Sequence, residues 1–209
     1  SILKLDSIKY NHALTRETVK STILSKTNLL IMIEGIFTQI CLSIPSFLMV
    51  GYLQSPPFNL SPFSGSLFII FFGMPGMMIG STLLAKKSDA LAKKSIKNRL
   101  YLIFVSLLAY DFVAFVVYVL PLPHLTAAEG GNFLVFMAFP VWWLVALIEF
   151  LVQMVGTLYG NNQRPLLQKI NLPEAQAGIS AANSFLEILA IGIGVIVAGS
   201  MLSLLNGNY

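Results

Sequence analysis

The sequence predicts an all-α membrane protein, a polytopic helical bundle with five transmembrane helices. Only 11% of the 209 residues are charged, whereas about 25% is usual in a soluble domain. The mean hydropathy is +0.78, and long apolar runs alternate with short polar segments. Each run is long enough to cross a bilayer, which takes about 20 helical residues. The predicted spans are roughly residues 27–53, 63–85, 99–120, 133–159 and 175–205.

Prolines and glycines give the first indication of how these spans pack. Pro45 lies inside the first span and Pro75 inside the second. A proline in mid-helix leaves a backbone carbonyl without its donor, so we expect a kink in both. Gly76 and Gly80 stand four residues apart in the second span, and Gly194 belongs to a similar small-residue stripe in the fifth. This spacing predicts close approach to a neighbouring helix.

The basic residues predict how the spans are oriented. Lys and Arg near span ends remain on the cytoplasmic side of a membrane. All 13 Lys and Arg residues lie before the first span, between the second and third, or between the fourth and fifth. We therefore expect an integral membrane protein with its N-terminus in the cytoplasm and its C-terminus outside. The net charge of +4 then reflects topology, so membrane lipid is an expected partner and nucleic acid is not.

Residues 1–26 are too polar to insert, and the transmembrane domain is predicted over residues 27–209. In this first segment apolar side chains such as Leu5 and Ile8 are interleaved with charged ones. The pattern is typical of a cytoplasmic amphipathic segment lying on the membrane surface or on a partner. A solvated linker with scattered apolar residues is the alternative.

Four of the nine acidic residues fall inside spans that contain no Lys, Arg or His. They are Glu34, Asp111, Glu149 and Glu187. A charge at the bilayer centre costs roughly 2.5–3.5 kcal/mol on insertion scales, so acids there usually face the bundle interior. Counted from the predicted span ends, Asp111, Glu149 and Glu187 lie near the midplane, and Glu34 lies closer to the cytoplasmic side. We expect these three to approach one another or to line one cavity.

Polar neighbours accompany these acids, and two interpretations remain open. Gln39 and Gln153 lie near Glu34 and Glu149, while Asn183 and Glu187 share one helix face. In the first interpretation these residues line a pathway, and a carboxyl group binds a proton or a cationic substrate. In the second, each acid is protonated and hydrogen-bonds a neighbouring helix. For Asn183 and Glu187 an interhelical hydrogen bond is the favoured role.

The remaining reactive residues do not predict an enzyme. The two histidines, His12 and His124, lie outside the spans, and Cys41 is the single cysteine. No span therefore offers a histidine as a base or as a haem or metal ligand. Asp111 follows Tyr110 but has no second Asp in any span, as two-carboxylate proteolysis would require. The sequence predicts neither a metal site nor a cofactor.

Two connections carry a resemblance to a known family. The first runs from Gly80 through Asp89 to a basic cluster of Lys93, Lys94 and Arg99. It resembles the Gly, Asp and basic loop that follows the second helix of each half of major facilitator superfamily (MFS) transporters. The resemblance implies that these five residues belong to a gating loop. Here Ala90 follows Asp89, where the family usually has a glycine or a Gly-Arg pair close by.

The second connection, residues 161–187, is similar to the loop and helix eleven start of prokaryotic members of that family. It places Pro173 and Glu174 after an asparagine, followed by a helix that carries Asn183 and Glu187 four residues apart. Ala-Gln-Ala follows Glu174, where the family usually has a basic residue and a glycine. The resemblance implies that the five spans are helices seven to eleven of the C-terminal half. Residues 1–26 would then end the central linker.

The resemblance also implies a function and partners. It implies part of a secondary active transporter that moves a small-molecule substrate by alternating access in a prokaryotic cytoplasmic membrane, proton-coupled through the intramembrane acids. The missing N-terminal half and last helix would be partners, in the same polypeptide or a separate chain. Since spans one and four line the pathway in this family, Glu34 and Glu149 are favoured over Asp111. The alternative is a non-catalytic five-helix structural or assembly subunit of a membrane complex, whose acids join helices.

Overall fold

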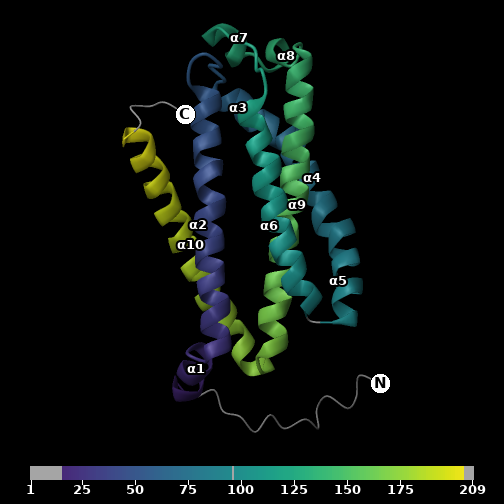
Figure 1. Cartoon of the computed structure of the whole chain (residues 1–209), viewed down its shortest axis with the longest axis vertical. Helices are drawn as coiled ribbons and strands as arrows, with labels where there is room; N and C mark the ends of the chain where they lie inside the picture. The colour runs from purple at the N-terminus through teal and green to yellow at the C-terminus, as the bar shows by residue number, and fades with distance from the viewer. Residues whose placement is uncertain (1–15, 96, 205–209) are drawn as a thin grey trace.

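A computed structural model describes residues 16–95 and 97–204, which form an elongated helical bundle (Figure 1). Five helices within this part of the chain are long and apolar enough to cross a membrane. We call them spans one to five: α2, the continuous helix from α3 to α5, α6, α9 and α10. The elements are α1 (Arg16–Ile23), α2 (Lys26–Gln54), α3 (Pro62–Phe68), η2 (Ile69–Gly73), α4 (Met74–Ile79), η3 (Gly80–Leu84), α5 (Ala85–Lys94), α6 (Lys97–Val119), α7 (Ala127–Gly131), α8 (Phe133–Phe136), α9 (Pro140–Ile170) and α10 (Pro173–Leu204).

The exposed surfaces of the spans are apolar. In the most apolar window of each span, only 11 to 28% is buried by the rest of the chain. Exposed Phe37, Phe112, Ile188 and Ile196 are typical of these faces. So much contiguous exposed apolar surface is unusual in a monomeric soluble protein, and it suits the interior of a bilayer.

The spans differ from the predicted ones mainly at their ends. The second span continues as helix to Lys94, and the fourth runs from Pro140 to Ile170 instead of from 133 to 159. Hydropathy follows the apolar part of a helix, so it misses polar turns that remain helical. At the start of the fourth span, Asn132 caps the separate short helix α8, and Pro140 then opens α9. Of the predicted segment 1–26, residues 1–15 lie outside the described residues. The rest contains α1 and the first residue of α2, Lys26.

Two π-helical turns, η2 and η3, interrupt the second span on either side of α4. Pro75 lies in the first turn of α4, directly after η2. Proline has no N–H to donate to the preceding turn, and a π turn is one way in which a helix accommodates such a break. The irregularity expected at Pro75 is therefore present as a π turn. Turns of this kind are frequent at functional sites.

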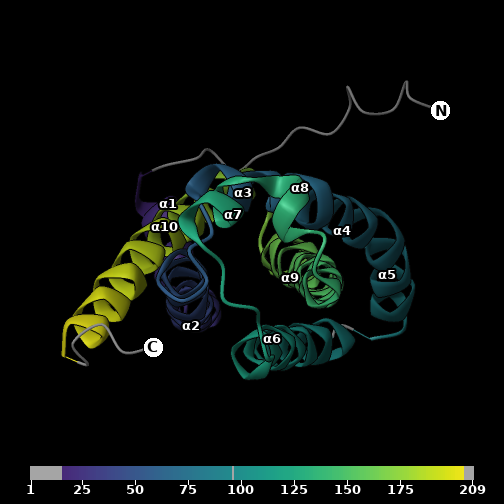
Figure 2. The ribbon, with the colours of Figure 1, turned by 90° about the horizontal axis from the view of Figure 1, so that it is seen from above.

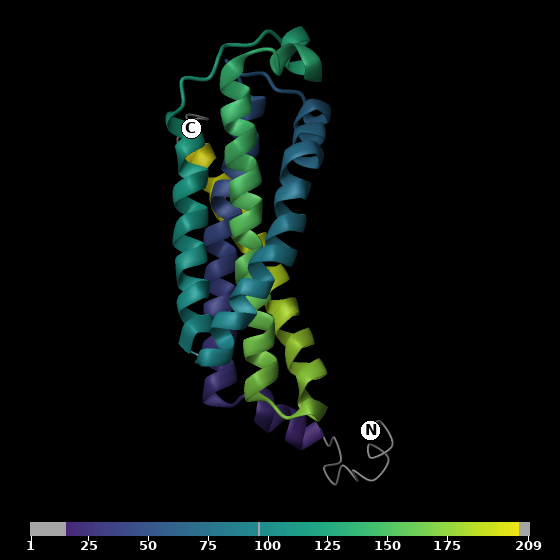
Figure 3. The same cartoon turned by 90° about the vertical axis from the view of Figure 1, so that its right-hand side faces the viewer.

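Span four is the central helix of the bundle. Seen from above, α9 lies between the second span and α6, while α2 lies beside α10 (Figure 2). The second span crosses α9 obliquely (Figure 3). Glycines make this crossing close: a Cβ atom on Gly76 would overlap the Phe150 carbonyl, and one on Gly80 would overlap the Met154 carbonyl. Gly194 brings α10 equally close to Ser43 of α2. The close packing predicted from the glycine spacing is confirmed.

The two ends of the bundle differ in charge. The α5–α6 and α9–α10 turns lie at the same end as α1 (Figure 1), and we call this the basic end. There the side chains of Asn28 and Asn171 exchange two hydrogen bonds of 2.8 Å, which tie α2 to the α9–α10 turn. Toward the opposite end, the fully buried rings of Trp142 and Phe136 pack against Phe68. This packing fixes α8 and α3 over the end of α9.

Candidate functional site

Glu187 of α10 is the centre of a polar cluster between three spans. Its Oε1 atom accepts hydrogen bonds from the Gln163 amide at 2.7 Å and the Tyr159 hydroxyl at 3.4 Å, both in α9. Asn183, one turn earlier in α10, donates to the same oxygen at 2.9 Å. Gln163 also donates to the Tyr159 hydroxyl at 2.6 Å. The interhelical hydrogen bonding predicted here is confirmed for Glu187.

Glu34 of α2 completes the cluster from the other side. Its Oε1 atom accepts a hydrogen bond of 2.8 Å from the Thr38 hydroxyl, and its carboxyl group interacts with Gln163 and Glu187. Gly35 allows this approach, because a Cβ atom there would lie 2.9 Å from Gln163 Nε2 and 3.0 Å from Glu187 Oε1. The side chains of Gln163 and Glu187 therefore pack directly against the α2 backbone at Gly35. The Glu34–Glu187 cluster, as we call it, consists of Glu34, Thr38, Tyr159, Gln163, Asn183 and Glu187.

Each of the three helices contributes two cluster residues that are four positions apart, on one helix face. Sequence reasoning found Glu34, Asn183 and Glu187 but missed Thr38, Tyr159 and Gln163. A search of the apolar runs for polar pairs at this spacing would have found Thr38. Tyr159 and Gln163 were missed because the fourth span was predicted to end at residue 159.

The charges of this cluster suit a cation. It brings two carboxyl groups together and contains no Lys, Arg or His. In addition, Asn183 is only 2% exposed, and its Oδ1 atom, a hydrogen-bond acceptor, has no donor among the described residues. Two carboxylates in a region of low dielectric do not readily carry two charges. A proton or another small cation would relieve the repulsion and supply the missing donor or charge.

Glu149 does not join this cluster, so the expectation that three acids share one cavity is wrong. Because α9 continues to Ile170, Glu149 lies about 30 Å from that end of the helix at ~1.5 Å per residue. There it accepts a 2.9 Å hydrogen bond from Gln153 and faces Gly73 of η2. Glu149 and Gln153 line a cavity of about 280 Å³ between α2, α3, α6 and α9, which we call the Glu149 cavity.

A second, more open cavity of about 560 Å³ adjoins the first. Gln39 and Gln153 both line it, whereas Glu34 does not. The two cavities share Ser46, Tyr110 and Gln153 as lining residues. A hydrogen bond of 3.1 Å joins the Ser46 and Tyr110 hydroxyl groups at this shared wall.

Asp111 lies apart from these features. It is half-buried on α6, lines neither cavity, and its Oδ1 atom is buried without a hydrogen-bond partner among the described residues.

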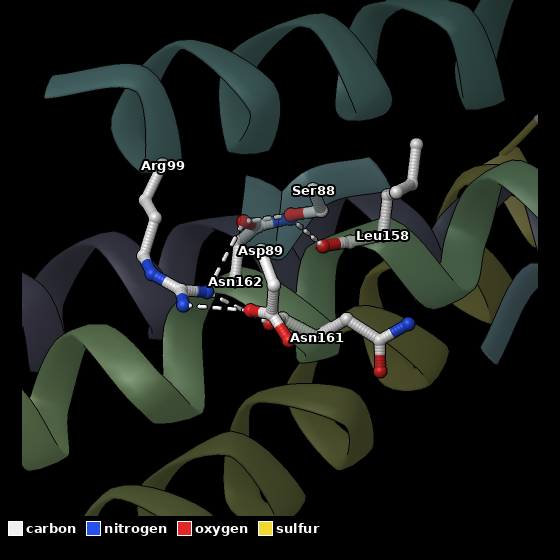
Figure 4. Close-up of polar contacts among 6 residues, drawn as sticks. All are labelled: Ser88, Asp89, Arg99, Leu158, Asn161 and Asn162. Carbon is white, nitrogen blue, oxygen red and sulfur yellow. Dashed lines mark hydrogen bonds and ion pairs between the residues drawn. The ribbon is translucent and has the colours of Figure 1, made fainter. Parts of the chain in front are cut away.

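The predicted gating residues do not lie together, since all of them except Gly80 lie at the basic end. Arg99 of α6 forms an ion pair of 2.8 Å with Asp89 of α5, and its Nη1 atom donates to the Asn161 carbonyl of α9 at 3.3 Å (Figure 4). Ser88 donates to Asn162 Oδ1 in the same network. These contacts join three spans. Gly80 lies near the middle of the second span and packs against α9, while Lys93 and Lys94 are exposed.

We expect Arg99→Leu to lower the free energy of unfolding by about 1.5–3 kcal/mol, the range for a hydrogen bond to a charged group. The guanidinium is 9% exposed, so its loss leaves the Asn161 carbonyl without this donor. Asp89 is 57% exposed, and Asp89→Asn should cost at most about 1 kcal/mol. Unfolding in mixed micelles measures both, with Lys93→Ala as the control. Equal costs for Arg99 and Asp89 would contradict this account.

The described residues contain no group of three or more His, Cys, Asp or Glu side chains arranged to hold a metal ion. In comparisons with known proteins, no family model, curated protein or solved structure matches the chain.

Proposed function

We propose that the chain is an integral membrane protein and forms part of a secondary active transporter of the MFS type. It would move a small solute by alternating access, with the basic end in the cytoplasm of a prokaryote. The C-terminus would lie outside. The five apolar spans and the gathering of Lys and Arg at one end support this topology.

The observation that carries the proposal is the Glu34–Glu187 cluster. Two carboxyl groups from spans one and five meet inside the bundle, without a basic residue, where they can bind and release a proton. Ionisable groups at this depth are usually found on ion or substrate pathways. We propose that protonation of this cluster couples transport to the proton gradient.

The packing of the spans also supports an MFS-type half, in which two three-helix units repeat. Span one packs along span five, and span four packs along span two. If spans one and four are equivalent, as are spans two and five, these are the same contact repeated. Span three packs along span four. The equivalent place along span one is where the last helix of such a half would lie.

Flux measurements test the coupling. The protein from its full reading frame would be reconstituted in liposomes and offered solutes of several classes, with and without a pH gradient. Stimulation by the gradient should disappear in Glu34→Gln and Glu187→Gln, because glutamine cannot exchange a proton. Asp111→Asn, an acid outside the cluster, is the matched control and should retain it. Full stimulation in both glutamine variants would overturn the coupling, and absence of uptake for every class would overturn the transporter.

A structural or assembly subunit is the second candidate, favoured by one observation. Glu187 Oε1 accepts hydrogen bonds from Tyr159 and Gln163 of α9, as expected of a group that joins helices. The mass of the native polypeptide separates the two candidates. A product near twice this size favours the transporter, and one of this size without an adjacent half favours the subunit.

A further inference from the structure

The Glu149 cavity combines apolar walls with one acidic group. Leu53, Val117 and Ile148 are among the apolar side chains that line it. Among the described residues, no Lys, Arg or His lines it, and Glu149 is the one charged residue on its wall. The polar and charged lining residues are Ser46, Gln54, Ser66, Tyr110, Glu149 and Gln153.

The carboxyl group of Glu149 is held by a hydrogen bond and has no cationic partner among the described residues. Gln153 holds Oε1 through a hydrogen bond of 2.9 Å, and among the described residues no cation pairs with it. Gly73 leaves room at this position, because a Cβ atom there would lie 2.9 Å from Glu149 Oε1. An anionic ligand would meet this carboxylate without a compensating positive group. A cationic ligand would supply the missing charge.

The other residues that line the cavity indicate what the uncharged part of the ligand would be. Phe68 and Tyr110 offer aromatic rings, which attract cations through their faces. A fully hydrated inorganic ion would leave the apolar walls without contacts, whereas an organic cation covers them. The volume of about 280 Å³ is near the lower limit of small-molecule pockets, about 300 Å³. A compact ligand of about one ring therefore fits best.

From these observations we infer that the Glu149 cavity binds a small organic cation with an apolar body, with Glu149 as its counter-ion. The binding of this cation does not depend on the proposed function. The further statement that this cation is the transported solute does rest on the proposed function. The site is separate from the Glu34–Glu187 cluster, and we assign different roles to this cluster and to Glu149. One binds the proton, and the other binds the organic cation.

Binding of two probes of the same shape tests the inference. Phenyltrimethylammonium carries the positive charge, and tert-butylbenzene has carbon in place of nitrogen. Both would be equilibrated with the protein from its full reading frame in lipid nanodiscs, and binding to empty nanodiscs would be subtracted. We expect saturable binding of the cation that weakens by at least about tenfold, or 1.4 kcal/mol, in Glu149→Gln. The neutral probe should bind wild type and variant equally.

Two further variants keep the outcome decisive. Asp111→Asn removes an acidic group that lines neither cavity and should leave binding of the cation unchanged. Gly65→Leu adds a large side chain to the cavity wall and should weaken the binding of both probes. The wall has room for its first atom, because the nearest atom to an added Cβ at Gly65 is 3.8 Å away. The inference is overturned if wild type shows no saturable cation binding, or if Glu149→Gln and Asp111→Asn weaken it equally. Neither result would alter the outcome of the flux test of proton coupling.

Discussion

Gly76→Ala is expected to destabilise the protein by about 1–3 kcal/mol, the usual cost of overpacking a tight interface. The added Cβ atom would overlap the backbone carbonyl of Phe150 in α9. A backbone atom cannot rotate away as a side chain can, so the two spans would have to separate. Because α9 is the central helix, that separation would also disturb its contacts with α6. Thermal unfolding in a single detergent measures the effect.

Gly192→Ala is the matched control for this prediction. Both glycines lie inside helices, and alanine is favoured over glycine in a helix by about 1 kcal/mol. At Gly192 no atom lies within 4 Å of the added Cβ atom, so this preference is not opposed. Gly192→Ala should therefore maintain or raise the melting temperature. If both substitutions had the same effect, the close approach of α4 to α9 would be refuted.

The order of the spans and their close contacts could be predicted from sequence because both depend on local patterns. Apolar runs mark five helices, and small residues at intervals of four mark where Gly76 and Gly194 approach other helices. Helix ends were harder, since polar turns such as residues 161–170 are helical without being apolar. Because the predicted fourth span ended at residue 159, Glu149 was assigned the wrong depth, and Gln163 was assigned to a connection between helices.

The meeting of Glu34 with Glu187 could not be predicted for a different reason. Their proximity depends on the register between α2 and α10, which is set by contacts such as Gly194 against Ser43. No pattern within either helix contains that register. The depth estimates placed Glu187, Glu149 and Asp111 near the middle of the membrane and Glu34 closer to the cytoplasmic side. They could not tell which two would share a cluster.

Glu187→Leu should lower the free energy of unfolding by about 2 kcal/mol, whereas Glu34→Leu should change it by less than about 1 kcal/mol. Side-chain hydrogen bonds between membrane helices average about 0.6 kcal/mol each. Glu187 accepts three from Asn183, Gln163 and Tyr159, and all three of these donors are buried. Glu34 accepts one, from Thr38. Removal of either acid relieves the repulsion between the two carboxyl groups, so the difference between the variants comes from the number of hydrogen bonds lost.

Glu187→Gln separates the structural role of this residue from proton coupling. Its amide oxygen can still accept hydrogen bonds, so we expect it to retain most of the stability that Glu187→Leu loses. The same variant cannot exchange a proton, so under the proposed function it should lose the response of uptake to a pH gradient. Loss of the response with stability retained assigns the cluster to coupling. Retention of both would assign Glu187 to helix packing alone, as in the structural subunit.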